Sequence, residues 1–510
     1  MKRLQWIWEG DGYLRVTILM AMAASLASFV YFYSQGVTLL YVDAESHLMI
    51  AKRVVGSLTP GFAQLGGTWL PLPHILMLPF VWNDFMYWSG LAGSIVSMIS
   101  FVLATVFIYK IALLLTEDKG AGLIAAFIFA INPNILYMQS TPMGELLLTL
   151  FVVAAIYCLI KWSQDINKLQ YLFATALAVF LATLTRYDGW GLLLAVVAVL
   201  LFISIRNHFD YHKIEGHLVY FGTLAGFGIF LWLLWCQVIL GDFLYSQRGK
   251  YSYPVTFTAD PKIVGNLYLA TLSYGFAILE NIGIVAVLLG TLGFLYFLFS
   301  ERLNLGEKAS ATVLLFPIPF YIILLYRGQS ILQVPEIVGS LYNYRVALLI
   351  VVTTALFAGY LTQKRIWLKA LVVIGITAGT MMMFHANNIV TLNDPLANRA
   401  GEISIRQATI AQWLSQNYDG GFILMENFRN ELVVFESRIP MGKFIYEGSY
   451  KYWEPALENP QDFAKWVFMR GGITPDKVWK ALHSTPQLLD NYDLVYQNGG
   501  IEIYKRKPTL

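Results

Sequence analysis

The sequence has few cysteines and little charge. Its two cysteines, Cys158 and Cys236, both lie inside apolar runs, so we expect neither a disulfide framework nor thiol chemistry. Only 13% of the 510 residues are charged and 57% are hydrophobic, which excludes an ordinary soluble protein. The net charge of +3 is small and its basic residues are scattered among short loops, so nothing indicates a nucleic-acid partner.

Long apolar runs are abundant instead. About eleven segments are long and apolar enough to cross a bilayer as helices, which predicts a polytopic α-helical membrane protein. The stretch 263–280 is apolar but ends at Glu280, and we expect a re-entrant or interfacial helix there. The predicted spans lie near 14–33, 88–114, 120–135, 144–162, 170–185, 189–205, 218–240, 281–299, 311–326, 342–360 and 366–384.

Basic residues predict how these spans are oriented. With the N-terminus inside, every short cytoplasmic connection carries at least two basic residues, as the positive-inside rule expects. We therefore expect a multi-pass protein of the plasma membrane with a cytoplasmic N-terminus and an uncleaved first helix. The loops expected outside are 34–87, 136–143, 186–188, 241–280 and 327–341, together with the C-terminal tail.

After residue 385 the composition becomes that of a soluble domain. Helix-period and strand-period segments alternate there, which predicts a small extracytoplasmic α/β domain over 386–510, following a membrane domain over 1–385. We expect helices over 402–416 and 476–482, strands over 422–425 and 465–469, and a terminal hairpin of 493–496 with 501–504.

Acidic and basic side chains recur at the outer ends of several predicted spans. Asp43 and Glu45 directly follow the first span, and ionisable groups beside a membrane are functional candidates because they are costly there. Carboxylates suit general-base work on a hydroxyl group, and arginine suits a phosphate leaving group. This combination predicts group transfer from a phosphorylated lipid carrier. The other residues on this face include His47, Trp69, His74, Glu145, Arg186, Asp188, Arg248 and Arg345.

Each candidate also has a simpler interpretation. Asp43 and Glu45 would cap a helix start, and Glu145 would be an ordinary acid in the first turn of a span. Arg186 and Asp188 would be a structural pair at a tight turn. Arg345 would reach from the first turn of a span to the membrane interface. His47 and His74 would be hydrogen-bonding groups or metal ligands, and Trp69 would be part of an aromatic belt or a platform for a sugar.

The segment 45–57 has apolar positions with Lys52 and Arg53 interspersed. This composition is typical of a helix that lies in the plane of the membrane surface. We expect it to wall the active-site cavity and to help admit a lipid donor.

Four segments, in this order, resemble the outer-loop motifs of the GT-C glycosyltransferases, among relatives of the protein O-mannosyltransferases and lipid A aminoarabinose transferases. The resemblance covers roughly residues 1–385 in layout. The segments read DAESHLMIAKRVVGSLTPGFAQLGGTWLPLPHILMLPF after the first span, QSTPMGE, LTRYDGW and YNYRVAL.

The resemblance implies an inverting transferase with the GT-C fold. Its donor would be a sugar, most simply a mannose-type hexose, on a polyprenyl or dolichyl phosphate, and its acceptor a protein, lipid or polysaccharide. Asp43 would be the base, while Glu45 and Glu145 would hold the acceptor or a metal, or Glu145 a basic side chain. Arg345 and Arg186 would bind the donor phosphate, and Asp188, His74 and Trp69 would support the site.

The sequence departs from the family at the first motif. Many relatives have adjacent acids, whereas Ala44 separates Asp43 from Glu45 here. Asp43-x-Glu45 also matches a DxD-like site for Mg or Mn, although residues two apart on a helix point in different directions. We leave the metal, with Asp43, Glu45 and Glu145 as its ligands, open.

Two other function classes compete with a transferase. A ligase or oligosaccharyltransferase would share the lipid-phosphate chemistry, but the Trp-Trp-Asp-Tyr-Gly motif of the latter is absent. A transporter of lipid-linked glycans would show internal repeats and ionisable residues at mid-span, and the sequence has no convincing repeat. We rank the transferase first.

Overall fold

The structure of the protein is a computed structural model that describes residues 11–252, 259–472 and 474–508. It forms two compact units that are not continuous in sequence. The helical unit comprises the described residues of Met1–Thr38, Gly67–Pro73 and Ser94–Ala397. The mixed unit comprises Leu39–Gly66, His74–Gly93 and the described residues of Asn398–Leu510. This grouping differs from the predicted division at residue 385, because most of the first predicted outer loop packs with the C-terminal segment.

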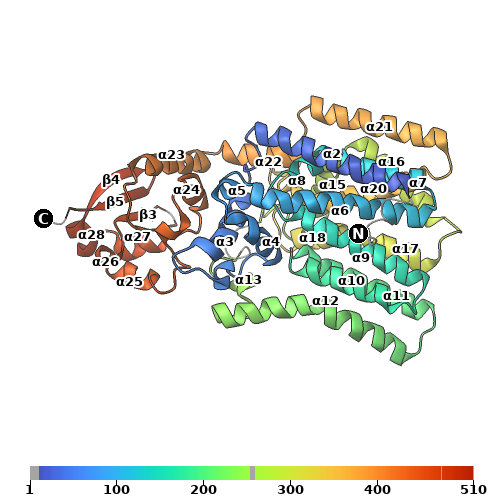
Figure 1. The fold of residues 1–510 in the computed structure, drawn as a ribbon, viewed down its shortest axis with the longest axis horizontal. Helices are drawn as coiled ribbons and strands as arrows, with labels where there is room; N and C mark the ends of the chain where they lie inside the picture. The colour runs from blue at the N-terminus through green and yellow to red at the C-terminus, as the bar shows by residue number, and fades with distance from the viewer. Residues whose placement is uncertain (1–10, 253–258, 473, 509–510) are drawn as a thin grey trace, which may run out of the picture. The chain divides into compact units, whose positions relative to one another are not determined.

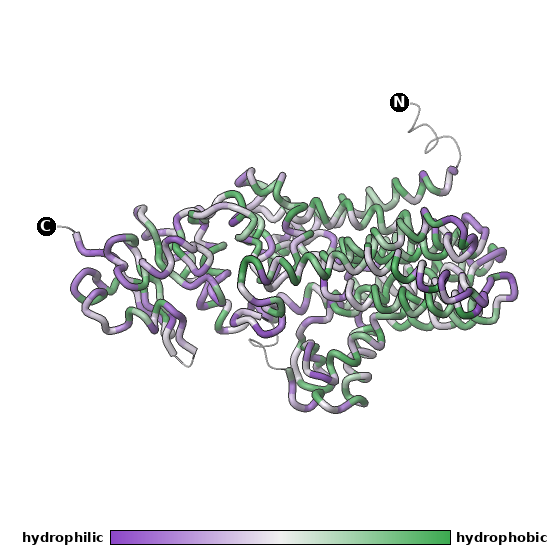
Figure 2. The backbone as a smooth tube through the Cα atoms, turned by 90° about the horizontal axis from the view of Figure 1, so that it is seen from below, coloured by the Kyte–Doolittle hydropathy of each residue, from purple (hydrophilic) through white to green (hydrophobic). Residues whose placement is uncertain are grey.

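The helical unit is built around helices of membrane-spanning length. Within the described residues, eight helices are long and apolar enough to cross a membrane. Figure 2 shows hydrophobic colour along these helices and hydrophilic colour at many of the connecting loops. The eight are α2 (Gly12–Ser34), α6 (Leu91–Thr116), α9 (Glu145–Gln164), α11 (Asp188–Arg206), α12 (Tyr211–Leu240), Leu305–Tyr326, Tyr344–Leu361 and Ile366–Arg399.

Three of these eight are interrupted helices. Leu305–Tyr326 consists of α17 (Leu305–Thr312), η2 (Val313–Leu315) and α18 (Pro317–Tyr326). Tyr344–Leu361 begins with η3 (Tyr344–Ala347) and continues as α20 (Leu349–Leu361). Ile366–Arg399 contains α21 (Ile366–His385) and α22 (Val390–Arg399). Short helices α13 (Tyr245–Arg248) and α19 (Pro335–Val338) lie in the loops.

Two further segments are bent helix pairs. Helices α7 (Lys119–Ala130) and α8 (Pro133–Gln139) meet at 67°, and α15 (Leu267–Ile282) and α16 (Ile284–Leu298) meet at 106°. The second bend falls at Gly283, whose φ of +81° suits glycine because it has no Cβ. If each pair is one span, the described residues hold up to ten. The re-entrant or interfacial character expected for 263–280 stays a prediction.

The predicted span 170–185 is a shorter helix than the others. Helix α10 (Leu169–Thr183) has 15 residues, and a rise of about 1.5 Å per residue makes it shorter than the roughly 30 Å hydrocarbon core of a bilayer. The chain turns directly after it, before α11 begins at Asp188. The helix predicted over 170–185 is therefore present as α10, but it is a short segment.

Close helix packing in the unit depends on small residues. Helix α20 packs against both α16 and α7, as Figure 1 also shows. A Cβ on Gly293 would lie 1.9 Å from the backbone oxygen of Phe357, and one on Gly359 would lie 2.6 Å from Ala125. Glycine thus lets these backbones approach, as it does in other membrane helix bundles. About 89% of the window around α20 is buried, so this helix forms the core of the unit.

The mixed unit contains the predicted α/β domain. Its five-stranded sheet has the order β2-β1-β3-β5-β4, in which β1 pairs in parallel with β2 and β3, and β5 is antiparallel to β3 and β4. The predicted strands and terminal hairpin are present, whereas β2 was not predicted. The strands are β1 (Ile423–Leu424), β2 (Phe444–Ile445), β3 (Trp466–Arg470), β4 (Tyr492–Asn498) and β5 (Ile501–Arg506).

Helices surround this sheet. Helix α3 (Val42–Gly56), from the first predicted outer loop, packs against α24 (Glu431–Glu436) and η4 (Met441–Lys443). The helix predicted over 45–57 is therefore present, and Leu48, Ala51 and Val54 are among its buried residues. Its position in the plane of the membrane surface stays a prediction. The other helices that belong wholly or mainly to the unit are η1 (Phe62–Leu65), α4 (Leu72–Val81), α5 (Asp84–Trp88), α23 (Glu402–Asn417), α25 (Trp453–Glu458), α26 (Pro460–Phe463), α27 (Lys477–Leu482) and α28 (Pro486–Asn491).

Candidate active site

The turn between α10 and α11 carries Arg186 and Asp188. The turn is tight because Gly189 lies against α10, where a Cβ would be 2.3 Å from the backbone carbonyl of Ala182. Arg186 Nε donates to Asp188 Oδ2 over 3.2 Å. Arg186 and Asp188 therefore form the structural pair considered above as the simpler interpretation, but Arg186 has a second partner as well.

That partner is Glu145, the first residue of α9. Its side chain is 5% exposed, and Oε1 accepts a hydrogen bond from Arg186 Nη1 over 2.7 Å. The other oxygen, Oε2, is buried and accepts no hydrogen bond from the part of the chain that the structure describes. Glu145 thus anchors an arginine with one oxygen and has acceptor capacity left on the other.

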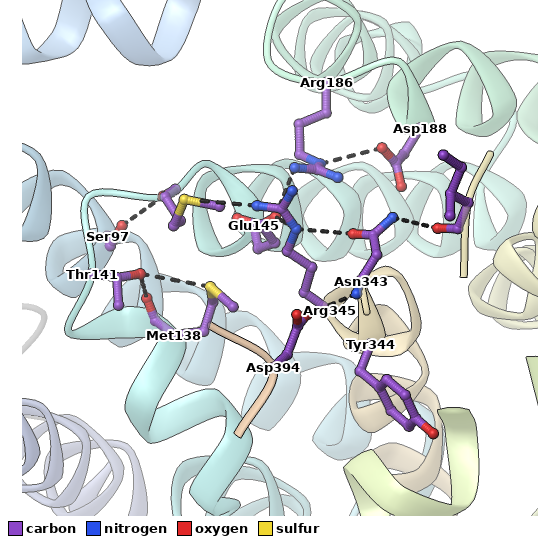
Figure 3. Close-up of polar contacts among 12 residues, drawn as sticks. Ser97, Met138, Thr141, Glu145, Arg186, Asp188, Asn343, Tyr344, Arg345 and Asp394 are labelled. Carbon is purple, nitrogen blue, oxygen red and sulfur yellow. Dashed lines mark hydrogen bonds and ion pairs between the residues drawn. The ribbon is translucent and has the colours of Figure 1, made fainter. Parts of the chain in front are cut away.

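Arg345 approaches the same carboxylate from η3. Its Nε lies 3.7 Å from Glu145 Oε1 and donates to Asn343 Oδ1 over 3.0 Å. Its Nη1 lies 3.8 Å from the sulfur of Met143. Figure 3 shows the guanidinium of Arg345 between Glu145 and Asn343, with Arg186 reaching Glu145 from another element.

The backbone around Arg345 is held by Asn343. Asn343 has a φ of +65°, a conformation that asparagine tolerates better than most residues. Its N–H donates to Asp394 Oδ2 over 2.8 Å, and its side-chain amide donates to the carbonyl of Ile331. We did not single out Asn343 from the sequence, although it stands in the YNYRVAL motif two residues before Arg345.

Tyr321 was also missed. Its hydroxyl donates to Asp188 Oδ1, and its ring stacks on Tyr274 with centroids 5.5 Å apart. Asp188 is therefore bonded on both oxygens, to Arg186 and to Tyr321. Tyr321 lies in the apolar run of α18, where nothing in the sequence distinguishes it from a core aromatic residue.

These groups line a small pocket in the helical unit. It is lined by Glu145, Arg186, Asp188 and Arg345, and by apolar residues of α9 and α20. Two guanidinium groups and two carboxylates converge here, and arginine forks match phosphate oxygens. The sequence placed Glu145, Arg186, Asp188 and Arg345 on one side of the membrane, and the structure brings all four together.

Trp69 is half-buried in the loop before α4, where the neighbouring Thr68 carbonyl accepts a hydrogen bond from Tyr187.

Asp43, Glu45 and His74 belong to the mixed unit. Asp43 is half-buried in the first turn of α3, while Glu45 is buried and accepts a hydrogen bond from Arg399 over 2.7 Å. His74 is completely buried, and its Nε2 lies 2.8 Å from Nδ1 of His47. His47 follows Asp43 by one helical turn, so both lie on the same side of α3.

The suggested metal site does not fit these residues. Asp43 and Glu45 are two apart on a formed helix, and Glu45 is engaged by Arg399. Within residues 11–252, 259–472 and 474–508, no three His, Cys, Asp or Glu side chains gather so that they could hold a metal ion. We therefore derive no step through a metal.

Comparison with known proteins identifies the fold. Residues 81–235, which include Glu145, Arg186 and Asp188, match the family model of dolichyl-phosphate-mannose-protein mannosyltransferase. No curated protein sequence matches the chain. The structure is similar to ArnT from Cupriavidus metallidurans bound to undecaprenyl phosphate, with 11% identity and a TM-score of 0.58 over 98% of both chains.

Two archaeal structures are also similar. The oligosaccharyltransferase of Archaeoglobus fulgidus in complex with Zn and sulfate has 12% identity and a TM-score of 0.51, over 90% of this chain and 67% of that one. AglB of the same organism, with an inhibitory peptide and a dolichol-phosphate, has 11% identity and a TM-score of 0.50, over 89% and 68%. The chain thus has the fold of ArnT and of the archaeal oligosaccharyltransferase, and its residues 81–235 match the mannosyltransferase family model, in agreement with the resemblance seen in the sequence.

Proposed function

We propose that the protein transfers a sugar from a polyprenyl- or dolichyl-phosphate carrier to a hydroxyl group of an acceptor. The acceptor oxygen attacks C1 of the sugar and loses its proton to a base. The bond between C1 and the phosphate oxygen breaks, and the lipid phosphate leaves as an anion. A single displacement of this kind inverts the configuration at C1.

The pair Arg186 and Arg345 carries the proposal. Both guanidinium groups lie beside Glu145 and line one cavity, where two positive charges suit a phosphate that gains charge as it leaves. Glu145 orients Arg186, and Asp188 supports it from the other side. The complexes of ArnT with undecaprenyl phosphate and of AglB with a dolichol-phosphate support a lipid-phosphate donor.

Asp43 is the base in this proposal. It takes the proton of the acceptor hydroxyl, since it is a carboxylate in the first turn of α3. His47, on this helix, forms a hydrogen-bonded pair with His74, and the pair supports the local structure of the helix in this proposal. Trp69 supplies an aromatic face on which the sugar stacks.

The family model that matches residues 81–235 favours a mannose-type hexose. The acceptor is a protein, a lipid or a polysaccharide. Transfer takes place on the extracytoplasmic face of the plasma membrane, because the basic residues favour a cytoplasmic N-terminus. In this proposal the C-terminal domain is extracytoplasmic as well, because it follows the last predicted span.

Transfer of a whole lipid-linked glycan is the second candidate. The similarity to the oligosaccharyltransferase of Archaeoglobus fulgidus favours it, because that fold also covers 90% of this chain. Both candidates share the lipid-phosphate chemistry and differ mainly in the size of the donor glycan.

A donor panel tests the proposal. The purified protein in lipid nanodiscs is incubated with undecaprenyl- and dolichyl-phosphate carrying mannose, glucose or aminoarabinose, and with lipid-linked oligosaccharides. Consumption of donor and release of lipid phosphate are measured with and without chelator. We expect a monosaccharide donor to be consumed, and Asp43→Asn to lower turnover at least about 100-fold, the usual contribution of a general base.

Other outcomes are equally informative. Consumption of only the oligosaccharide donors would favour the second candidate. If no lipid-phosphate donor is consumed, the proposed reaction fails. If Asp43→Asn retains turnover while binding donor, the assignment of Asp43 as the base fails.

A further inference from the structure

Arg399, the last residue of α22, makes four hydrogen bonds within the mixed unit. Its side chain is only 15% exposed. Nε donates to the carbonyl of Leu40 over 2.8 Å, and Nη2 donates to the carbonyl of Leu39 over 2.9 Å and to Glu45 Oε1 over 2.7 Å. Nη1 donates to Glu436 Oε1 on α24 over 2.9 Å.

Three of these four partners flank Asp43 along the chain. Leu39 and Leu40 precede it, Glu45 follows it by two residues, and one planar guanidinium binds all three. The N-cap of α3 is Tyr41, which forms no side-chain capping bond. In many helices a polar N-cap side chain holds the first turn. At α3 the side chain of Arg399, distant in the sequence, takes this role.

The fourth bond ties this segment to the α/β domain. Glu436 ends α24, the helix against which α3 packs. If the loop before α3 were free to move, the first turn of α3 could shift. The rigid guanidinium group of Arg399 binds two carbonyl and two carboxyl groups and so holds this turn in place. Lysine has no such fork and cannot bind four acceptors in these directions.

We propose that Arg399 is a positioning residue for the reaction, which holds Asp43 at the place where it takes the acceptor proton. The inference rests on the proposed function of Asp43. Arg399 touches neither sugar nor phosphate in this role, so its loss acts on the chemical step. A displacement of a reacting group by about 1 Å can lower a rate roughly 100-fold.

The test compares Arg399→Met and Arg399→Lys with a matched control in the same domain. Arg406 pairs with Glu402 on the exposed side of α23 and donates to the carbonyl of Gly499, so Arg406→Met removes an arginine of similar setting outside the site. Turnover, the KM for donor, direct binding of donor and the pH dependence of kcat are measured in nanodiscs, with thermal unfolding as a check on the fold.

For Arg399→Met we expect kcat to fall 10- to 100-fold, donor KM and donor binding to stay within threefold, and the acidic limb of the kcat–pH profile to shift. Arg399→Lys should recover part of the loss, and Arg406→Met should leave all values unchanged. If Arg399→Met does not fold, a fall of at least fivefold in kcat for Arg399→Lys at unchanged donor binding supports the inference.

The result that overturns it is kcat within twofold of the parent for Arg399→Met, or for Arg399→Lys when only that variant folds. A loss that Arg406→Met shares, or that appears only as weaker donor binding, also overturns it. Asp43→Asn separates this failure from that of the proposed function. If Asp43→Asn is inactive and Arg399→Met is fully active, the base assignment stands and the positioning role fails.

Discussion

Replacing Arg345 by lysine is the sharpest test of the phosphate site. The Arg345 side chain is 13% exposed and uses its fork in several directions, toward Glu145, Asn343 and Met143. Lysine keeps the positive charge but offers one compact ammonium group. The substitution therefore separates the geometry of the guanidinium from its charge.

The expected size of the effect follows from the hydrogen bonds. A hydrogen bond to a charged group contributes about 1.5–3 kcal/mol. Arginine can offer two parallel bonds to a phosphate, and lysine in the same place keeps the equivalent of one. Because 1.4 kcal/mol corresponds to about a tenfold change in affinity, Arg345→Lys should raise the donor KM about tenfold or more. Arg345→Met, which loses both bonds, should raise it about 100-fold.

Initial rates over a range of donor concentrations measure this effect. Arg248→Lys is the control, since Arg248 also binds a carboxylate, Asp242, through both Nε and Nη2, but its side chain is 66% exposed. We expect the control to leave donor KM and kcat unchanged, and Arg345→Lys to lower kcat as well as raise donor KM, because the phosphate gains charge as it leaves. A donor KM within twofold of the parent for Arg345→Lys would refute the phosphate role of this residue.

Two further predictions concern the elements that hold the site. Gly189→Ala should lower the melting temperature, by the equivalent of about 1–3 kcal/mol of unfolding free energy, and raise the donor KM, because its Cβ would meet the backbone of Ala182 at 2.3 Å and open the Arg186 turn. Gly216→Ala is the control, because a Cβ there meets nothing within 4 Å. An unchanged melting temperature for Gly189→Ala would contradict the packing argument. Burial raises the pKa of Glu45 to about 8, against the opposing charge of Arg399. The folded protein then holds a proton that the unfolded chain releases above its ordinary pKa of 4.5, so the contribution of Glu45 to stability is full below pH 4.5 and is lost as the pH rises toward 8. Melting temperatures of Glu45→Gln between pH 4.5 and 8 should therefore fall less than those of the parent, and parallel curves would show that Glu45 does not titrate in this range.

Several features of this protein were predictable from short stretches of sequence. Three patterns can be read from short segments: apolar runs of membrane length, the period of α3, and the alternation of helix and strand patterns after residue 385. Each pattern shows which residues of a segment are buried. The helices and most of the strands therefore appear where we expected them. Motifs at the ends of spans also marked Glu145, Arg186, Asp188 and Arg345, because polar groups stand out against an apolar background.

Only the tertiary structure decided which of these groups meet. Glu145 and Arg186 are 41 residues apart and Arg345 is farther still, and nothing local indicates that one carboxylate serves both arginines. Tyr321 is indistinguishable from a core aromatic residue, and Arg399 from a surface arginine, until their partners are known. The bend at Gly283 and the short helix α10 were equally hidden. The physical reason is that burial is periodic along the chain, whereas hydrogen bonds between distant residues depend on how the helices pack, which no single segment encodes.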